Sequence, residues 1–144
     1  VCLSKGLGAP VGSVLLGSEE TIYKARRIRK VLGGGMRQAG FLAAAGIYAL
    51  DHHIERLKED HQKARILAET LKASALVKDV MPADTNIVIF ELSDKYNADE
   101  FVDKLVHYGI KCNTFGKQMI RFVTHLDISE DMVDYTVQTL KKIQ

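Results

Sequence analysis

The sequence predicts an α/β protein that ends in a small α+β unit with an antiparallel sheet. Three observations support this prediction. Short apolar runs flank a glycine-rich loop at residues 4–13, helical periodicity covers residues 18–32 and 54–71, and two strand-like apolar runs follow at residues 86–92 and 119–124. The composition, 47% hydrophobic and 26% charged, is that of an ordinary globular protein. A net charge of +2 is too small to indicate a nucleic-acid partner.

The first element is a sharp loop, SKGLGAPVGS at residues 4–13, between two predicted strands at 1–3 and 14–17. Lys5 lies where the first strand ends, amid apolar sequence. We expect its ammonium to be poorly solvated, which lowers the pKa of the lysine and favours the free amine that attacks carbonyl groups. The alternative is an ordinary turn whose lysine reaches water.

Three helices are predicted next. Ser18, followed by two glutamates, caps a helix that runs to about Leu32, where a glycine triplet ends it. Residues 39–50 are apolar around most of a helix, which predicts burial in an interior or a subunit interface. A long amphipathic helix then connects two domains; its apolar face contains Ile54, Leu57, Ala64, Leu67 and Leu71.

The remaining chain alternates strands and helices. After a strand at 86–92, Asn97 opens a helix that Gly109 ends, and two strands at 110–115 and 119–124 follow. Ser129 opens the final helix. We expect an antiparallel sheet with helices on one face.

Arg121 is a candidate for binding a carboxylate. In its strand it points to the face opposite Ile120 and Phe122, and its planar guanidinium matches a carboxylate with two parallel hydrogen bonds. The alternative is a salt bridge to an acidic side chain of the protein. His125, on the same strand face or just beyond the strand end, is a weaker candidate for the same region.

Basic residues crowd positions 24–30, but helical geometry spreads them around the helix, so we expect most to be solvated. Lys30, three residues before Gly33, is the exception. Arg37 lies near the start of the next helix, where backbone N–H groups favour anions, and we expect it to contact a phosphate or carboxylate.

The two cysteines and the other four histidines are not expected to have a catalytic or metal-binding role. Cys2 and Cys112 are far apart without metal-ligand spacing, so we expect reduced, buried thiols. The remaining histidines are expected on solvated helix surfaces or ends: His52, His53, His61 and His107.

Three motifs, in order along the chain, give a family resemblance: SKGLGAPVGS at 4–13, GGGMRQAG at 33–40 and IRFVTH at 120–125. The sequence resembles the low-specificity L-threonine aldolases, which belong to the fold-type I (aspartate-aminotransferase-like) pyridoxal phosphate enzymes. The resemblance implies that Lys5 binds pyridoxal phosphate as an imine and that Arg121 holds the substrate carboxylate. It also implies that Arg37 lines the pocket on the cofactor side and Lys30 on the substrate side.

The same resemblance covers less than half of such an enzyme, its C-terminal part, so we expect a fragment of a longer protein. It implies that residues 1–50 are the end of the large cofactor-binding domain and its sheet. Residues 51–81 are then the linking helix, and residues 82–144 form the small domain. The implied activity is cleavage of threonine or allo-threonine to glycine and an aldehyde, by a cytoplasmic homodimer or homotetramer without membrane or nucleic-acid partners. Two alternatives stay open: another β-eliminating lyase, or a catalytically inactive interaction module.

Overall fold

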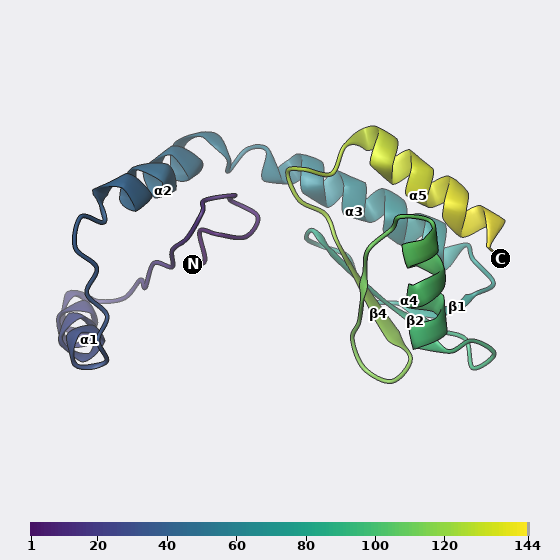
Figure 1. The fold of residues 1–144 in the computed structure, drawn as a ribbon, viewed down its shortest axis with the longest axis horizontal. Helices are drawn as coiled ribbons and strands as arrows, with labels where there is room; N and C mark the ends of the chain where they lie inside the picture. Colours follow the sequence, from purple (N-terminus) through teal and green to yellow (C-terminus); the bar gives the residue numbers. More distant parts are fainter. Residues whose placement is uncertain (144) are drawn as a thin grey trace. The chain divides into compact units, whose positions relative to one another are not determined.

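The computed structural model describes residues 1–143 and divides the chain into two compact units, Val1–Arg56 and a second unit that begins at Leu57. Figure 1 shows helices α1 and α2 in the first unit and the sheet with its helices in the second. Each unit is described separately below.

The first unit opens with a tight loop instead of two strands. The strands expected at 1–3 and 14–17 are wrong: the two sides of the loop form an isolated antiparallel bridge, between Cys2 and Ser13, with backbone hydrogen bonds on either side of it. A two-stranded ribbon alone is marginally stable, and no further described strand pairs with residues 14–17. The loop is therefore a closed hairpin end without a sheet behind it.

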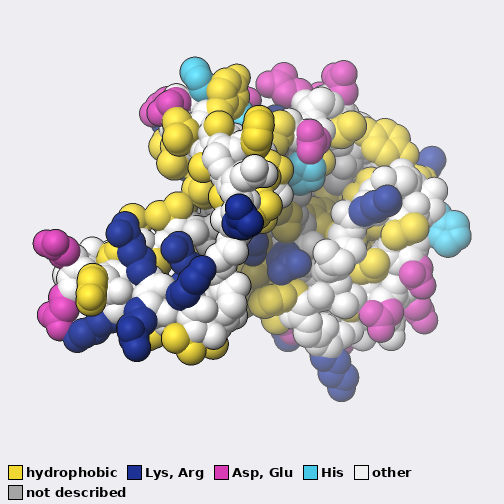
Figure 2. Space-filling model, turned by 60° about the vertical axis from the view of Figure 1, so that its left-hand side comes forward, with side chains coloured by type: hydrophobic (Ala, Val, Ile, Leu, Met, Phe, Trp, Pro, Cys, Tyr) yellow, Lys and Arg dark blue, Asp and Glu magenta, His cyan; other side chains and the backbone are white. Residues whose placement is uncertain are grey.

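Helix α1, Glu19–Val31, confirms the predicted start and stop. The Ser18 hydroxyl accepts a hydrogen bond from the backbone N–H of Thr21 at 3.3 Å, and acidic residues occupy the first turn. None of its residues is buried. Figure 2 shows Lys and Arg side chains spread over an exposed surface, as expected for the basic run.

Helix α2, Gly40–His52, is far more exposed than predicted. Only Gly46 and Ala49 are buried, and Phe41 is 89% exposed. The reason is that the loop supplies little apolar surface to cover the helix; Leu3 packs closely against Gly46, where an added Cβ would lie 3.1 Å from the Leu3 Cδ1 atom. The predicted interior position is thus wrong for the first unit as it stands.

The second unit is a two-layer structure. Its sheet has the order β1-β2-β4-β3 and every neighbouring pair is antiparallel, as predicted. The strands are β1 Val77–Val80, β2 Ile87–Leu92, β3 Asn113–Thr114 and β4 Met119–Val123. The helices are α3 Leu57–Lys72, α4 Ala98–His107 and α5 Glu130–Lys142 (Figure 1).

Alternation along the two central strands creates the core. Side chains of one sheet face are fully or almost fully buried and form one cluster with residues of all three helices: Val88, Phe90, Leu92, Ile120 and Phe122 from the strands, with Leu71, Leu105 and Leu140 among the helical members. The prediction of helices on one face is confirmed. The helix starts at Asn97 and Ser129 are confirmed too, since both side chains accept hydrogen bonds from backbone N–H groups of the first turn.

Two details of the predicted elements are wrong. The linking helix expected within residues 51–81 is shorter, because α3 ends at Lys72 and Val77–Val80 joins the sheet as an edge strand beside β2. The strand expected at 110–115 is reduced to Asn113–Thr114, since only these residues pair with β4. Among the residues described, no helix is long and apolar enough to cross a membrane.

Candidate functional site

The Lys5 loop is closed by backbone hydrogen bonds and presents the lysine outward. Leu3 N–H donates to the Gly12 carbonyl at 2.9 Å, and Gly8 N–H donates to the Lys5 carbonyl at 2.8 Å. Gly12 has a φ of 131°, a backbone conformation that side-chain-bearing residues rarely adopt. The backbone around Lys5 is therefore fixed by the chain itself.

The expected desolvation of Lys5 is wrong for this chain. Leu3, Leu7 and Ala9 are buried, but the Lys5 side chain is exposed. The loop turns its apolar side chains inward and leaves the amine on its outer side. An accessible primary amine on a fixed backbone is suited to react with a carbonyl compound that reaches it from outside.

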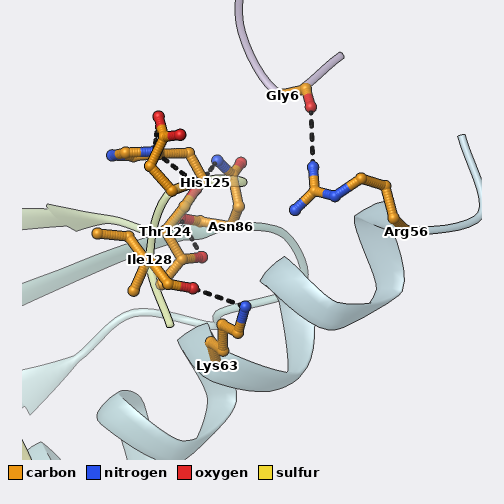
Figure 3. A network of polar contacts seen from close by, with 8 residues as sticks. Gly6, Arg56, Lys63, Asn86, Thr124, His125 and Ile128 are labelled. Atoms are coloured by element: carbon orange, nitrogen blue, oxygen red, sulfur yellow. Dashed lines mark hydrogen bonds and ion pairs between the residues drawn. The ribbon is translucent and has the colours of Figure 1, made fainter. Parts of the chain in front are cut away.

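Two side chains beyond α2 hold the loop. His53 Nδ1 lies 2.6 Å from the Leu7 carbonyl oxygen. Arg56 Nη1 donates to the Gly6 carbonyl at 3.4 Å (Figure 3). His53 lies at the end of α2, as expected, but it is half-buried, so the expected solvation is wrong. The sequence gives no signal for this contact, because the two partners are 46 residues apart.

Lys30 and Arg37 flank the glycine triplet. Gly34 N–H donates to the Arg29 carbonyl at 2.8 Å, and a Cβ on Gly34 would lie 2.5 Å from Arg29 Cγ, so the turn excludes a side chain. Lys30 Nζ lies over Gly35, 3.0 Å from where its Cβ would be. Both basic side chains are exposed.

Arg37 occupies the turn that leads into α2. This helix starts at Gly40, and the residue before it, Ala39, makes no side-chain capping hydrogen bond. The first backbone N–H groups of α2 therefore have no capping side chain as acceptor. The Arg37 guanidinium belongs to a residue only three positions before this helix start. Such an arrangement is compatible with an anion, and the anion contact of Arg37 stays a prediction.

Arg121 occupies the middle of β4, between Ile89 of β2 and Asn113 of β3. Its guanidinium carbon lies 5.9 Å from the centre of the Phe115 ring. The Nε atom is buried and has no hydrogen-bond partner among residues 1–143. The alternative prediction was a salt bridge to a carboxylate of the protein. Among residues 1–143, Arg121 forms no ion pair.

The candidate residues are divided between the two units. Lys5, Lys30 and Arg37 belong to the first unit and Arg121 to the second. His125 contacts Asp127: its Nδ1 accepts a hydrogen bond from the Asp127 backbone N–H at 3.3 Å and lies 3.4 Å from the Asp127 carboxylate.

Both cysteines are free thiols, as predicted, but the predicted burial is wrong for Cys2, which is exposed beside Ser4. Cys112 is half-buried, and burial raises its pKa to about 11. No group of three or more His, Cys, Asp or Glu side chains able to hold a metal ion occurs among the described residues.

Comparison with known proteins identifies similar chains. A family model described as beta-eliminating lyase matches residues 1–95. The chain is 43% identical over 146 residues to a probable low-specificity L-threonine aldolase 2 of Arabidopsis thaliana, covering 99% of this chain and 41% of the plant protein. It is 44% identical over 133 residues to the low specificity L-threonine aldolase of Escherichia coli K12, covering 92% of this chain and 38% of the bacterial protein.

A solved structure, of a putative L-allo-threonine aldolase from Listeria monocytogenes, superposes on the chain with a TM-score of 0.76. It is 19% identical, and the match covers 99% of this chain and 43% of the bacterial one. At this identity the likeness concerns the fold, and it confirms the predicted fold class. The chain spans about two fifths of the length of the curated relatives it matches.

Proposed function

Because this chain belongs to the beta-eliminating lyase family, we propose that its protein is a pyridoxal phosphate-dependent aldolase that cleaves threonine or allo-threonine to glycine and an aldehyde. The names of the relatives that are 43% and 44% identical support the reaction. The observation that carries the proposal is the exposed Lys5 amine on a loop fixed by its own hydrogen bonds and by His53.

The residues present suit the three reactive parts of such a complex. We assign Lys5 Nζ to the cofactor aldehyde, because the loop leaves this amine accessible. We assign Arg37 to the cofactor phosphate, since it stands beside the uncapped start of α2. Lys30, over Gly35 in the adjoining turn, is assigned to the substrate side.

Arg121 is assigned to the substrate carboxylate. Its Nε atom is buried without a partner in the described residues, and burying an unsatisfied donor costs about 1–3 kcal/mol. A bidentate carboxylate would satisfy that donor together with an Nη atom. By fixing the carboxylate, Arg121 would orient the bond between Cα and Cβ.

Pyridoxal phosphate, when bound, accepts the electron pair that is released as the Cα–Cβ bond breaks. The protein's own tasks are then to bind, orient and move protons. Arg121 holds the carboxylate. We assign Lys5 Nζ, once it is a free amine, to take up the proton that leaves the substrate β-hydroxyl group and, as the ammonium, to return it to Cα, which gives glycine.

Borohydride reduction of the full-length holoenzyme tests the central assignment. Reduction fixes the cofactor to the lysine that holds it, and peptide mapping should locate the pyridoxyl group on Lys5. A Lys5→Ala variant should carry no label at all. A label on another lysine would refute the role of Lys5.

A second candidate function is β-elimination from another amino acid, favoured by the description of the matched family itself. The two reactions differ in their products. The aldolase releases an aldehyde from threonine, whereas an eliminating lyase releases ammonia and an oxo acid such as pyruvate. Assaying both products on a panel of amino acids distinguishes them.

The proposal extends to assembly and location. We propose a homodimer or homotetramer, because α1 and α2 expose large apolar side chains, among them Tyr23, Phe41, Ile47 and Tyr48. The cytoplasm is the location proposed with it. A neighbouring copy that covers this surface would also place Lys30 or Arg37 near a second Lys5. Light scattering of the full-length protein measures the number of subunits.

A further inference from the structure

A cavity of about 520 Å³ lies inside the second unit, between α5 and the segment 109–111 that follows α4. Its inner wall is apolar and includes Leu67, Phe122 and Val133, all of them buried core residues. The lining also includes two exposed charged residues, Lys111 from the segment 109–111 and Asp131 from α5. We call it the α5 cavity.

The α5 cavity exists because two strands separate. β3 and β4 pair at Asn113 with Arg121 and at Thr114 with Ile120, and the described pairing ends there. Continuing the register would join residues 110–112 to 122–124, but Ile110 N–H instead donates to the Leu105 carbonyl of α4 at 2.9 Å. This bond closes the C-terminal end of α4, so the Ile110 N–H is not available to β4.

Two further contacts fix the opening. Gly109, with a φ of 76°, turns the chain sharply at the end of α4. The Tyr135 hydroxyl, on α5, donates to the Tyr108 carbonyl at 3.0 Å and closes one end of the cavity wall. The α5 cavity is therefore built by hydrogen bonds of the fold, with a helix on one side and a fixed loop on the other.

Two opposite charges face the opening without a partner. Lys111 and Asp131 both line the cavity, and neither forms an ion pair or side-chain hydrogen bond among residues 1–143. An anionic ligand would satisfy Lys111 but be repelled by Asp131, and a cationic ligand would meet the reverse situation. A ligand with both charges and an apolar part satisfies all three features of the cavity.

We propose that the α5 cavity binds a free α-amino acid with an apolar side chain. The Asp131 carboxylate accepts hydrogen bonds from the ligand ammonium, the Lys111 ammonium donates to the ligand carboxylate, and the side chain packs against Leu67 and Phe122. This site does not depend on the proposed aldolase activity. Phe122 and Arg121 are adjacent in β4, so alternation directs their side chains to opposite faces of the sheet.

A calorimetric titration of the full-length protein with L-leucine tests the proposal. An Arg121→Lys background weakens amino-acid binding at the substrate site, so the remaining binding reports the cavity. We expect L-leucine to bind, and 4-methylpentanoate and 3-methylbutylamine, which each lack one charge, to bind at least about tenfold more weakly.

Matched variants locate the binding. Lys111→Gln and Asp131→Asn should each weaken leucine binding about tenfold. Lys142→Gln and Asp134→Asn, on the same helix α5 but outside the cavity lining, should leave it unchanged. Folding of each variant is checked by circular dichroism, and Asp131→Glu, which keeps the charge, should retain binding.

Three results would each overturn the proposal. The first is no leucine binding at 10 mM, a concentration about ten times the millimolar dissociation constant of a weak site. The others are equal binding of 4-methylpentanoate and leucine, and unchanged leucine binding in Lys111→Gln and Asp131→Asn. Equal binding of the acid would show an anion site, and unchanged binding would show that leucine sits elsewhere.

Discussion

The Nδ1 atom of His53 and the carbonyl oxygen of Leu7 are 2.6 Å apart. Because a carbonyl oxygen only accepts hydrogen bonds, Nδ1 must carry the hydrogen, which fixes the tautomer of a neutral His53. Leu7 follows Lys5 by two residues, and its own side chain is buried. The imidazole therefore fixes the backbone that presents the Lys5 amine.

Replacing His53 with Phe should reduce turnover without removing the lysine. The substitution keeps the ring size but deletes the hydrogen bond, which contributes about 0.5–1.5 kcal/mol, so we expect kcat to fall about two- to tenfold with a smaller change in KM. Steady-state kinetics of the full-length enzyme measures this.

His52→Phe is the matched control. The His52 ring is exposed, and its centre lies 4.2 Å from that of the Tyr48 ring on the same helix. It should leave kcat unchanged. Equal loss of activity in both variants would mean that the end of α2 is generally sensitive and that His53 has no special role.

Replacing Arg121 with Lys should damage substrate binding although the charge is kept. A lysine ammonium lacks the planar fork that binds both carboxylate oxygens. Hydrogen bonds to charged groups contribute about 1.5–3 kcal/mol, so we expect kcat/KM for threonine to fall about ten- to a hundredfold. A fall of the same size in decarboxylated analogues of the substrate would contradict a carboxylate contact.

Replacing Arg37 with Gln should weaken retention of the cofactor. Loss of one charged contact to a phosphate corresponds to about a tenfold higher dissociation constant. Dialysis followed by absorbance of the bound cofactor measures it. Arg27→Gln, an equally exposed arginine within α1, is the control and should retain the cofactor like the unmodified protein.

Local signals in the sequence predicted the helices well. Ser18, Asn97 and Ser129 each cap a helix within three residues of the expected start, because capping depends on a side chain and the N–H groups next to it. The alternation that predicted β2 and β4 also depends on neighbours along the chain.

Features that depend on distant residues were not predicted. β1 forms only by pairing with β2, and the apolar pattern around Val77 gives no sign of it. The His53 contact and the separation of β3 from β4 likewise need partners far along the chain. The exposure of α2 has the same cause. An apolar composition predicts that a helix is buried, but burial needs apolar residues elsewhere in the chain, and the described residues supply few of them.

The two cysteines should react with iodoacetamide over different pH ranges. The reactive species is the thiolate. A hydrogen bond from the Ser4 hydroxyl lowers the pKa of Cys2 below its ordinary 9.0, whereas burial raises the pKa of Cys112 to about 11. At pH 8 only roughly one Cys112 in a thousand is ionised, so Cys2 should be alkylated first. Between pH 8 and 10 the Cys112 rate should rise about a hundredfold, and the Cys2 rate should rise by a smaller factor because its lowered pKa leaves a larger thiolate fraction at pH 8. Mass spectrometry of tryptic peptides measures both rates, and Ser4→Ala should slow Cys2 alone; faster alkylation of Cys112 at pH 8 would contradict its burial.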